Sequence, residues 1–401
     1  MIGAVQVRVP NGALVLNAEQ GQGNRMNETI AADASPGPDQ PAAGAPDAPP
    51  PVLESAAAAA PAPIEHPFEF RGDEREYFRI WIVNLALTIL TLGIYSAWAK
   101  VRTQRYFYAN TRVAGTPFEY LAQPLPILKG RLIAFVVFGA YSLSRHISPQ
   151  VQLAAALAIF ALVPALIVLG QRFRARYSAW RNLNFAFVAT IGRAYVPFFL
   201  LYFLVPITLF IFYPIVKARQ KRFLVENHRY GGVALAFRAL DGDFFPPYLK
   251  GFGLILVWWV GAAIASGVIV AATMHGAHTP SMLGIYASVL LIYGGMFLIG
   301  IYVASRVANL FYNAIDIDGN RLRSTLGARE LMGLYLTNTL AILASAGMLI
   351  PWAMIRMARY RASRLTLLAH GDLAGFTAEE RLERDATGSE LSHFFDVEIG
   401  F

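Results

Sequence analysis

The chain has 401 residues, of which 56% are hydrophobic and 15% are charged, and its mean hydropathy is +0.44. Soluble domains carry about 25% charged residues, so this composition excludes an ordinary soluble domain and indicates a membrane protein. The chain has no cysteine, which excludes disulfides, thiolate metal sites and cysteine nucleophiles.

Both ends of the chain are acidic, although the formal net charge is +8. Residues 1–67 hold seven acids and two arginines, residues 371–401 hold eight acids and two arginines, and residues 68–370 keep a net charge of +19. The Pro- and Ala-rich stretch 1–67 is predicted to be a disordered tail that is dispensable for insertion. Residues 68–370 are predicted to form the membrane domain, followed by an acidic cytoplasmic segment.

Four stretches are long and apolar enough to cross a hydrocarbon layer of roughly 30 Å. They are residues 127–147, 151–170, 251–274 and 282–304, which pair into two spanning hairpins near 127–170 and 251–304. Lys129 and Arg131 stand at the start of the first stretch, where their long side chains are expected to snorkel.

A basic-aromatic cluster recurs along the chain. It consists of Lys100, Arg102, Arg105 and Tyr106, returns 117 residues later as Lys217, Arg219, Arg222 and Phe223, and returns 254 residues later as Arg356, Arg359 and Tyr360. The surrounding repeat units lie near 68–125, 193–246 and 328–370. Such self-similarity indicates repeated structural units that alternate with the spanning hairpins.

Each repeat unit contains a further apolar stretch, and seven full spans would place one basic loop outside the cell. We therefore favour re-entrant or interfacial hairpins on the cytoplasmic side, with seven spans as the alternative. Helix breaks are expected at Gly93, Pro206 and Gly347. Asn84 and Asn338 are expected as polar groups at membrane depth, where freed backbone groups need partners.

The predicted fold is an all-α polytopic membrane protein with both termini in the cytoplasm. Tandem repeats of a broken or re-entrant helix unit plus a transmembrane helical hairpin are expected, related by a pseudo-twofold axis along the membrane normal. Small cytoplasmic β-ribbons are predicted near residues 112–120, 184–189 and 314–318. Asp318-Gly319 is a typical hairpin turn.

The segment Phe68-Glu69-Phe70-Arg71-Gly72, the run TLGIYSAWAKVR at residues 91–102 and the following Arg105-Tyr106 carry a resemblance. In these residues the chain resembles the YjgN family of bacterial inner-membrane proteins. The resemblance covers about residue 68 to the end and implies an inner-membrane location. It implies no activity, because the family is a domain of unknown function.

Catalytic motifs are missing from the sequence. There is no phosphate-binding Gly loop, no HExxH and no GxSxG, so neither an enzyme nor a cofactor or metal site is expected. No acid lies between Glu119 and Glu226 or between Asp243 and Asp316. The predicted spans therefore lack the buried carboxylates on which ion-coupled carriers usually depend.

The repeated basic-aromatic cluster is the candidate site, because arginines three positions apart share one helix face. Three such faces, with the aromatic residues as interface anchors, would hold anionic headgroups of the phospholipid bilayer. The hypothesis is a membrane-organising or anionic-lipid-interacting protein that binds no nucleic acid. The alternatives are a passive transport pore or lipid carrier, and charges that only fix the topology. Homo-oligomer formation stays open.

Overall fold

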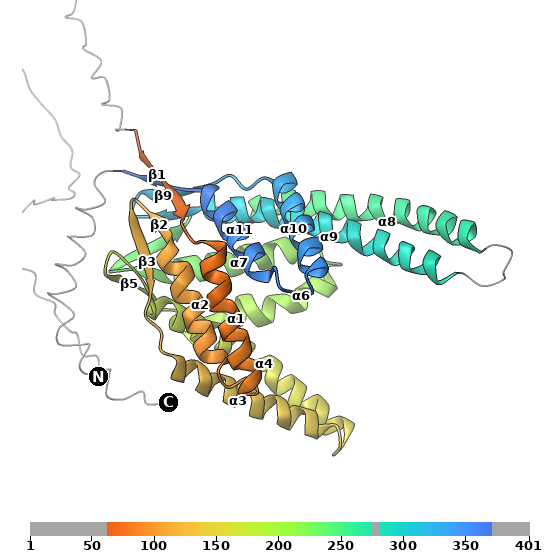
Figure 1. The fold of residues 1–401 in the computed structure, drawn as a ribbon, viewed down its shortest axis with the longest axis horizontal. Coiled ribbons are helices and arrows are strands. Elements are labelled where there is room, and N and C mark those ends of the chain that lie inside the picture. Colours follow the sequence, from red (N-terminus) through yellow and green to blue (C-terminus); the bar gives the residue numbers. More distant parts are fainter. Residues whose placement is uncertain (1–61, 275–280, 371–401) are drawn as a thin grey trace, which may run out of the picture. The chain divides into compact units, whose positions relative to one another are not determined.

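The computed structural model describes residues 62–274 and 281–370 (Figure 1). The predicted disordered tail therefore lies outside the described residues up to position 61, and the acidic segment 371–401 lies outside them altogether. Residues 64–67, which the sequence assigned to the tail, belong to the first strand. The first strand of the fold thus begins a few residues before the predicted boundary at residue 68.

Ten short strands form a closed antiparallel barrel in the described part of the chain. They are β1 (Ile64–Phe70), β2 (Thr111–Val113), β3 (Thr116–Tyr120), β4 (Ser178–Trp180), β5 (Leu183–Phe187), β6 (His228–Tyr230), β7 (Val233–Phe237), β8 (Ile315–Ile317), β9 (Asn320–Ser324) and β10 (Leu365–Ala369). Strand β1 closes the barrel, because Ile64 pairs with Ala369 of β10 and Phe68 pairs with Val113 of β2. The prediction of an all-α fold with small β-ribbons is therefore wrong, because the ribbons join into one closed barrel.

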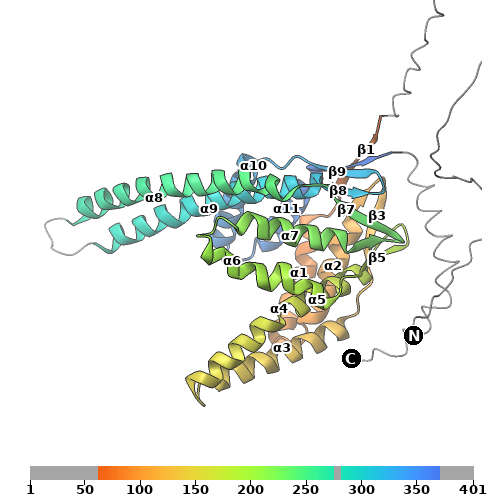
Figure 2. The same ribbon diagram turned by 180° about the vertical axis from the view of Figure 1, so that it is seen from behind.

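Helical hairpins connect the strands. The first three are α1 (Glu74–Leu90) with α2 (Ser96–Asn110), α3 (Pro124–Ser144) with α4 (Pro149–Arg176), and α5 (Ile191–Tyr195), a π-helical turn (Val196–Leu200) and α6 (Leu201–Ile207) with α7 (Tyr213–Glu226). The last two are a 3-10 turn (Asp241–Phe244) and α8 (Phe245–Thr273) with α9 (Met282–Asn313), and α10 (Ala328–Ala344) with α11 (Ile350–Ser363). Figure 2 shows the α6–α7 hairpin beside the longer α8–α9 pair.

The order strand, helical hairpin, strand occurs five times among the described residues. We call these segments modules 1 to 5, and they span residues 64–113, 116–180, 183–230, 233–317 and 320–369. Consecutive strands are antiparallel, so all five hairpins leave from one end of the barrel (Figure 1). The sequence predicts repeat units that alternate with spanning hairpins about a twofold axis, and this arrangement is not found. All five segments are instead modules of one kind, which follow one another around the barrel.

Tight two-residue turns link neighbouring modules at the other end of the barrel. In the Ala114-Gly115 turn the φ angles are 49° and 75°, and in the Asp318-Gly319 turn they are 51° and 81°. Two successive positive φ angles define the type I′ turn, whose twist matches that of antiparallel strands. This local geometry sets the register between the last strand of one module and the first of the next.

Apolar side chains fill the barrel. The five incoming strands contribute residues from one equivalent position, namely Phe68, Phe118, Phe185, Leu235 and Leu322. The outgoing strands add the buried side chains of Val113, Trp180, Tyr230 and Leu367. The ring centroids of Phe118 and Trp180 lie 6.1 Å apart, and those of Phe185 and Tyr230 lie 5.0 Å apart. The barrel interior is thus a packed core.

Four helical segments of the described residues are long and apolar enough to cross a membrane, and they agree with the four predicted spans. They are Pro124–Ser144, Pro149–Arg176, Asp241–Thr273 and Met282–Asn313. The hairpins of modules 1, 3 and 5 are shorter, since α1 and α10 have 17 residues each and a span needs about 20. Each of these three apolar stretches reverses direction and returns to the barrel.

The three short hairpins reverse through the same turn. Gly93 N–H donates to Thr88 O at 2.8 Å, and Gly347 N–H donates to Ile342 O at 2.8 Å. In module 3 the corresponding donor is Phe210, which lies at a φ of 67°. Pro206 lies within α6, one helical turn before this reversal.

Candidate functional site

One arginine at the base of each of four hairpins contacts the next module, and three of these four arginines belong to the predicted basic clusters. Nη2 of Arg105, Arg172 and Arg222 donates to the backbone oxygen of Ala122, Ala189 and Ala239 at 3.1, 2.7 and 2.7 Å. Arg359 Nη2 reaches Gly72 O at 3.2 Å and so joins module 5 to module 1. Arg172 lies outside the basic clusters predicted from the sequence, although the acceptor follows each of the first three arginines by 17 residues.

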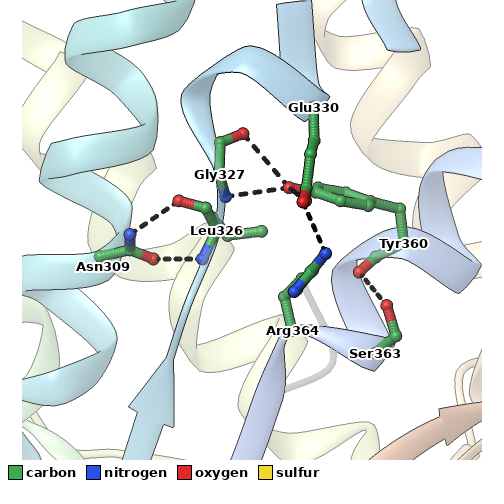
Figure 3. Close-up of polar contacts among 7 residues, drawn as sticks. All are labelled: Asn309, Leu326, Gly327, Glu330, Tyr360, Ser363 and Arg364. Atoms are coloured by element: carbon green, nitrogen blue, oxygen red, sulfur yellow. Dashed lines mark hydrogen bonds and ion pairs between the residues drawn. The ribbon is translucent and has the colours of Figure 1, made fainter. Parts of the chain in front are cut away.

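An asparagine fills the fifth equivalent position (Figure 3). Asn309 Nδ2 donates to Leu326 O at 2.9 Å, and its Oδ1 accepts from Leu326 N at 2.8 Å and from Ser324 Oγ at 2.8 Å. These bonds satisfy backbone groups that follow the end of β9. Every junction between neighbouring modules thus carries one side-chain bond to the same backbone position.

The two tyrosines of the clusters are hydrogen-bonded within their own modules. Tyr360 OH lies 3.0 Å from Gly327 N, 3.2 Å from Gly327 O and 2.9 Å from a carboxylate oxygen of Glu330 (Figure 3). Tyr106 OH makes the same set with Asp73 N at 2.8 Å, Asp73 O at 3.0 Å and Glu76 at 3.2 Å. Burial and the adjacent Glu76 carboxylate raise the pKa of Tyr106 to about 12, so its hydroxyl remains a donor.

The third aromatic residue of the clusters, Phe223, has no hydroxyl and packs edge-on against Phe198, with ring centroids 5.6 Å apart. Lys217 of the same cluster is held by neutral groups. Its Nζ lies 3.1 Å from Tyr202 OH and 3.3 Å from Gln220 Oε1. These contacts direct both side chains toward neighbouring residues of module 3.

The predicted polar positions Asn84 and Asn338 are buried and contact cluster arginines. Arg102 Nη1 lies 3.4 Å from Asn84 Oδ1, and Arg356 Nη1 lies 3.1 Å from Asn338 Oδ1. Arg356 Nη1 also donates to Thr337 Oγ1 at 2.7 Å. In modules 1 and 5 a neutral amide therefore orients the arginine without neutralising its charge.

Acidic partners distinguish the clusters. Asp241 pairs with both Arg219 at 2.5 Å and Arg222 at 2.8 Å. Glu74 pairs with Arg359 at 2.9 Å. Asp241 and Glu74 both stand at the first helical position of the next module.

The same position of module 2 holds a proline. Pro124 is the first residue of α3, so Arg105 meets no carboxylate there. Its guanidinium keeps the backbone contact with Ala122 and has further donors unspent.

Unpaired cations therefore gather on α2 and α3. They are Lys100, Arg102, Arg105, Lys129 and Arg131, which we call the α2–α3 basic face. The two helices pack together, and Arg131 Nη1 is hydrogen-bonded to Ser96 Oγ. Within residues 62–274 and 281–370 none of the five forms an ion pair. From the sequence, Lys129 and Arg131 are expected only to snorkel, because the contact between α2 and α3 exists only in the folded chain.

The buried carboxylate of Asp316 serves the barrel. It accepts from Gly319 N at 2.9 Å and pairs with Arg238 at 2.7 Å and Arg321 at 3.4 Å. Burial raises the pKa of Asp316, but the Gly319 N–H and the Arg238 guanidinium outweigh it, so the pKa lies below its usual value. This acid stays ionised and holds the β8–β9 turn.

The fold and these contacts define a membrane protein whose five helical hairpins surround one end of a packed ten-strand barrel. The chain belongs to the DUF898 family, described as bacterial protein of unknown function, whose model matches residues 65–394. This match confirms the family resemblance inferred from the sequence.

Two relatives are described as inner membrane protein YjgN. The protein from Salmonella typhimurium (strain LT2) is 31% identical over 147 residues, which is 36% of this chain and 37% of that protein. The protein from Escherichia coli (strain K12) is 34% identical over 142 residues, or 34% of each chain. The alignments thus span little more than a third of the relatives they match. No solved structure matches the chain.

Proposed function

We propose that this protein resides in the bacterial inner membrane and holds anionic phospholipid headgroups on the α2–α3 basic face. The observation that carries the proposal is the gathering of Lys100, Arg102, Arg105, Lys129 and Arg131 on two packed helices without a carboxylate partner in the described part of the chain. Each basic residue near an anionic surface contributes about 1 kcal/mol to lipid binding. Five cations together would select anionic over zwitterionic lipid.

Exposed apolar tips support insertion of the short hairpins into one leaflet. Leu92, Leu209 and Leu343 lie at or next to the three reversals and are 94%, 81% and 72% exposed. Exposed apolar tips of this kind would be unfavourable in water, whereas a bilayer would bury them among acyl chains. With the tips among acyl chains, the cations of α2, which lie closer to the barrel, would stand at the headgroup level.

The charge bias favours a cytoplasmic barrel. Most basic residues of the modules lie on hairpin bases and strands, and cytoplasmic segments carry the excess of lysine and arginine. The relatives named inner membrane protein support the same location. In this orientation the basic face meets the anionic inner leaflet.

A pore through the barrel is the weaker alternative. The side chains of Phe118, Trp180 and Tyr230 pack across the barrel interior, with successive ring centroids 6.1 and 5.8 Å apart. Aromatic rings in contact across the interior disfavour an aqueous route there. The contacts described inside the barrel therefore give no support to a pore along the barrel axis.

Charge removal on the basic face tests the proposal. The variant replaces Lys100, Arg102, Lys129 and Arg131 with glutamine and spares Arg105, which also holds Ala122. Native mass spectrometry of the purified protein would compare binding of phosphatidylglycerol with that of phosphatidylcholine. Loss of four contacts at about 1 kcal/mol each should remove most of the preference for the anionic lipid.

A matched control carries the same loss of charge at paired positions. It replaces Arg71, Arg219, Arg323 and Arg364, each of which has a carboxylate within 2.7 Å. The control should keep the anionic preference of the parent protein. Equal losses in both variants would show that net charge alone decides lipid selection and would overturn the assignment of the face.

A further inference from the structure

A large cavity lies between the barrel and the hairpins of modules 1, 4 and 5. Its volume is about 980 Å³, and α2, α9, α10 and α11 contribute to its walls. The incoming strands supply Phe68, Phe118 and Phe185, so the aromatic core of the barrel forms one boundary. We call this cavity the central chamber.

The walls of the central chamber are apolar, and several of its polar groups are already bonded. Tyr108 OH and Ser178 Oγ lie 3.1 Å apart, and Ser305 Oγ donates to Tyr302 O at 2.8 Å. A buried water needs two to four polar partners, which such a wall offers at few places. The chamber is therefore suited to an apolar chain.

One charged side chain stands at the chamber. Arg361 of α11 lines it together with Tyr335 of α10, and the Arg361 Nη2 to Tyr335 OH distance is 3.4 Å. This hydroxyl is the one hydrogen-bond partner of the Arg361 guanidinium among residues 62–274 and 281–370, and no carboxylate pairs with it there. An uncompensated cation beside an apolar space attracts an anion that carries an apolar body.

The space continues past Arg361. A second hollow of about 420 Å³ shares Phe107, Tyr335, Ala358 and Arg361 with the chamber. It runs along α10 and α11 as far as Ile350, near the reversal of module 5. Arg361 thus stands where the two spaces meet, beside apolar room for a long chain.

We infer that the central chamber binds an amphiphile with an anionic head, its acyl chain against the apolar walls and its head at Arg361 and Tyr335. The volume suits this occupant, because ligand sites of about 300–1,000 Å³ accommodate molecules of this size. The chemistry fits a fatty-acid carboxylate or a lysophospholipid phosphate. The site shares no residue with the α2–α3 basic face, so each of the two proposals can be tested independently of the other.

The first test fills the chamber. Gly300 lines it, and a Cβ added there would meet nothing within 4 Å, so the side chain of Gly300→Leu begins in open space. Gly294 of the same helix also has open space at its Cβ but does not line the chamber. Gly294→Leu is therefore the matched control for folding and helix propensity.

Native mass spectrometry of the detergent-purified full chain would measure binding of oleate, oleoyl lysophosphatidate and oleyl alcohol. The parent protein and Gly294→Leu should bind at least one of the two anions in preference to the alcohol. Gly300→Leu should lose most of this binding. The anion bound more tightly identifies the source of the head, and either one supports the chamber. Unchanged binding by a folded Gly300→Leu variant would overturn it.

The second test concerns the head. Arg361→Gln should weaken binding of the anionic amphiphile about tenfold, the effect of losing one charge-assisted hydrogen bond, and should leave oleyl alcohol unaffected. Arg361→Lys keeps the charge and should restore part of the preference. If Arg361→Gln binds both anions as the parent does, Arg361 does not receive the head and the proposal is wrong. The variants of the basic face should bind oleate normally, which separates the two sites.

Discussion

Two junctions between neighbouring modules share one arginine contact and differ in what surrounds it. At the junction of modules 3 and 4, Arg222 donates to Ala239 O at 2.7 Å and pairs with Asp241 at 2.8 Å. At the junction of modules 1 and 2, Arg105 donates to Ala122 O at 3.1 Å, and Pro124 takes the position of the acid. The two arginines make the same bond to the backbone, but Arg222 is paired with an acid and, within the described residues, Arg105 keeps an unpaired charge.

This difference separates the structural part of the repeated arginine from the part available to a ligand. The bond to a backbone oxygen occurs at four junctions and satisfies a group that would otherwise be unpaired near the end of a strand. The charge is the variable part. Where the next module supplies an acid, that acid pairs with the arginine. Arg105 on α2 has no such partner among the described residues, so its charge remains available to an external anion, together with the cations of α3.

The largest expected effect concerns the closing junction, which has no covalent turn. Deletion of residues 1–67 removes all four β1 residues that pair with β10, from Ile64 to Pro67. The sequence alone suggested that this tail is dispensable, but losing the strand pair should cost roughly 3–5 kcal/mol of stability. Thermal unfolding in detergent should show a much lower midpoint than in a chain deleted only to residue 61. Equal midpoints would mean that β1 does not hold the barrel closed.

The next effect comes from the arginines themselves. Arg222→Met removes a carbonyl bond and two ion pairs, with Asp241 and Glu226, and should cost about 3 kcal/mol, whereas Arg105→Met removes only the carbonyl bond and should cost about half as much. Thermal unfolding measures both. Only Arg105→Met should also weaken phosphatidylglycerol binding, since Arg222 is already paired with Asp241 and Glu226. A lower thermal midpoint for Arg105→Met than for Arg222→Met would contradict the claim that the ion pairs of Arg222 add to the stability of its junction.

A smaller effect follows from giving module 2 the acid that it lacks. In Pro124→Asp the new carboxylate stands where Asp241 stands in module 4, within reach of Arg105. Neutralising one cation should weaken phosphatidylglycerol binding by about 1 kcal/mol, or roughly fivefold. An acid at the first helical position also favours the helix N-terminus, so the fold should persist.

Pro124→Ser is the control for that substitution, because it removes the proline without adding charge. Native mass spectrometry should find its lipid binding equal to that of the parent. If Pro124→Asp also binds normally, Arg105 is not part of the lipid site.

Parts of the fold could be predicted from the sequence because their signals are local. The four long apolar helices and the Asp318-Gly319 turn depend on composition over 2 to about 30 neighbouring residues. The closed barrel could not be predicted, because strands such as β2 and β8 have three residues and show no usable alternation. Closure also requires β1 and β10, which lie about 300 residues apart along the chain.

The candidate site divides in the same way. The recurring arginines were visible as identities at fixed shifts, but their bonds to Ala122 and Ala239 depend on how one module packs on the next. Asp241 pairs with Arg219 from 22 residues away, so the sequence alone could not separate paired from unpaired charges. Arg361 belongs to no repeated cluster, and only the packing of α10 on α11 brings it beside Tyr335.

The smallest effect concerns the reversals of the short hairpins, where modules 1 and 3 differ in one residue. Gly93 has a φ of 92°, and Phe210 at the equivalent position has a φ of 67°. A left-handed backbone costs a residue with a Cβ about 1–2 kcal/mol. Glycine avoids this strain, but it loses more chain entropy on folding, which offsets part of the gain. Phe210→Gly should therefore raise the unfolding free energy by less than about 1 kcal/mol, and Gly93→Ala should lower it by about 1 kcal/mol. Since a Cβ at Gly93 would meet nothing within 4 Å, a loss there reports backbone strain alone. Thermal midpoints that move in the same direction for both variants would mean that the two reversals do not share this conformation.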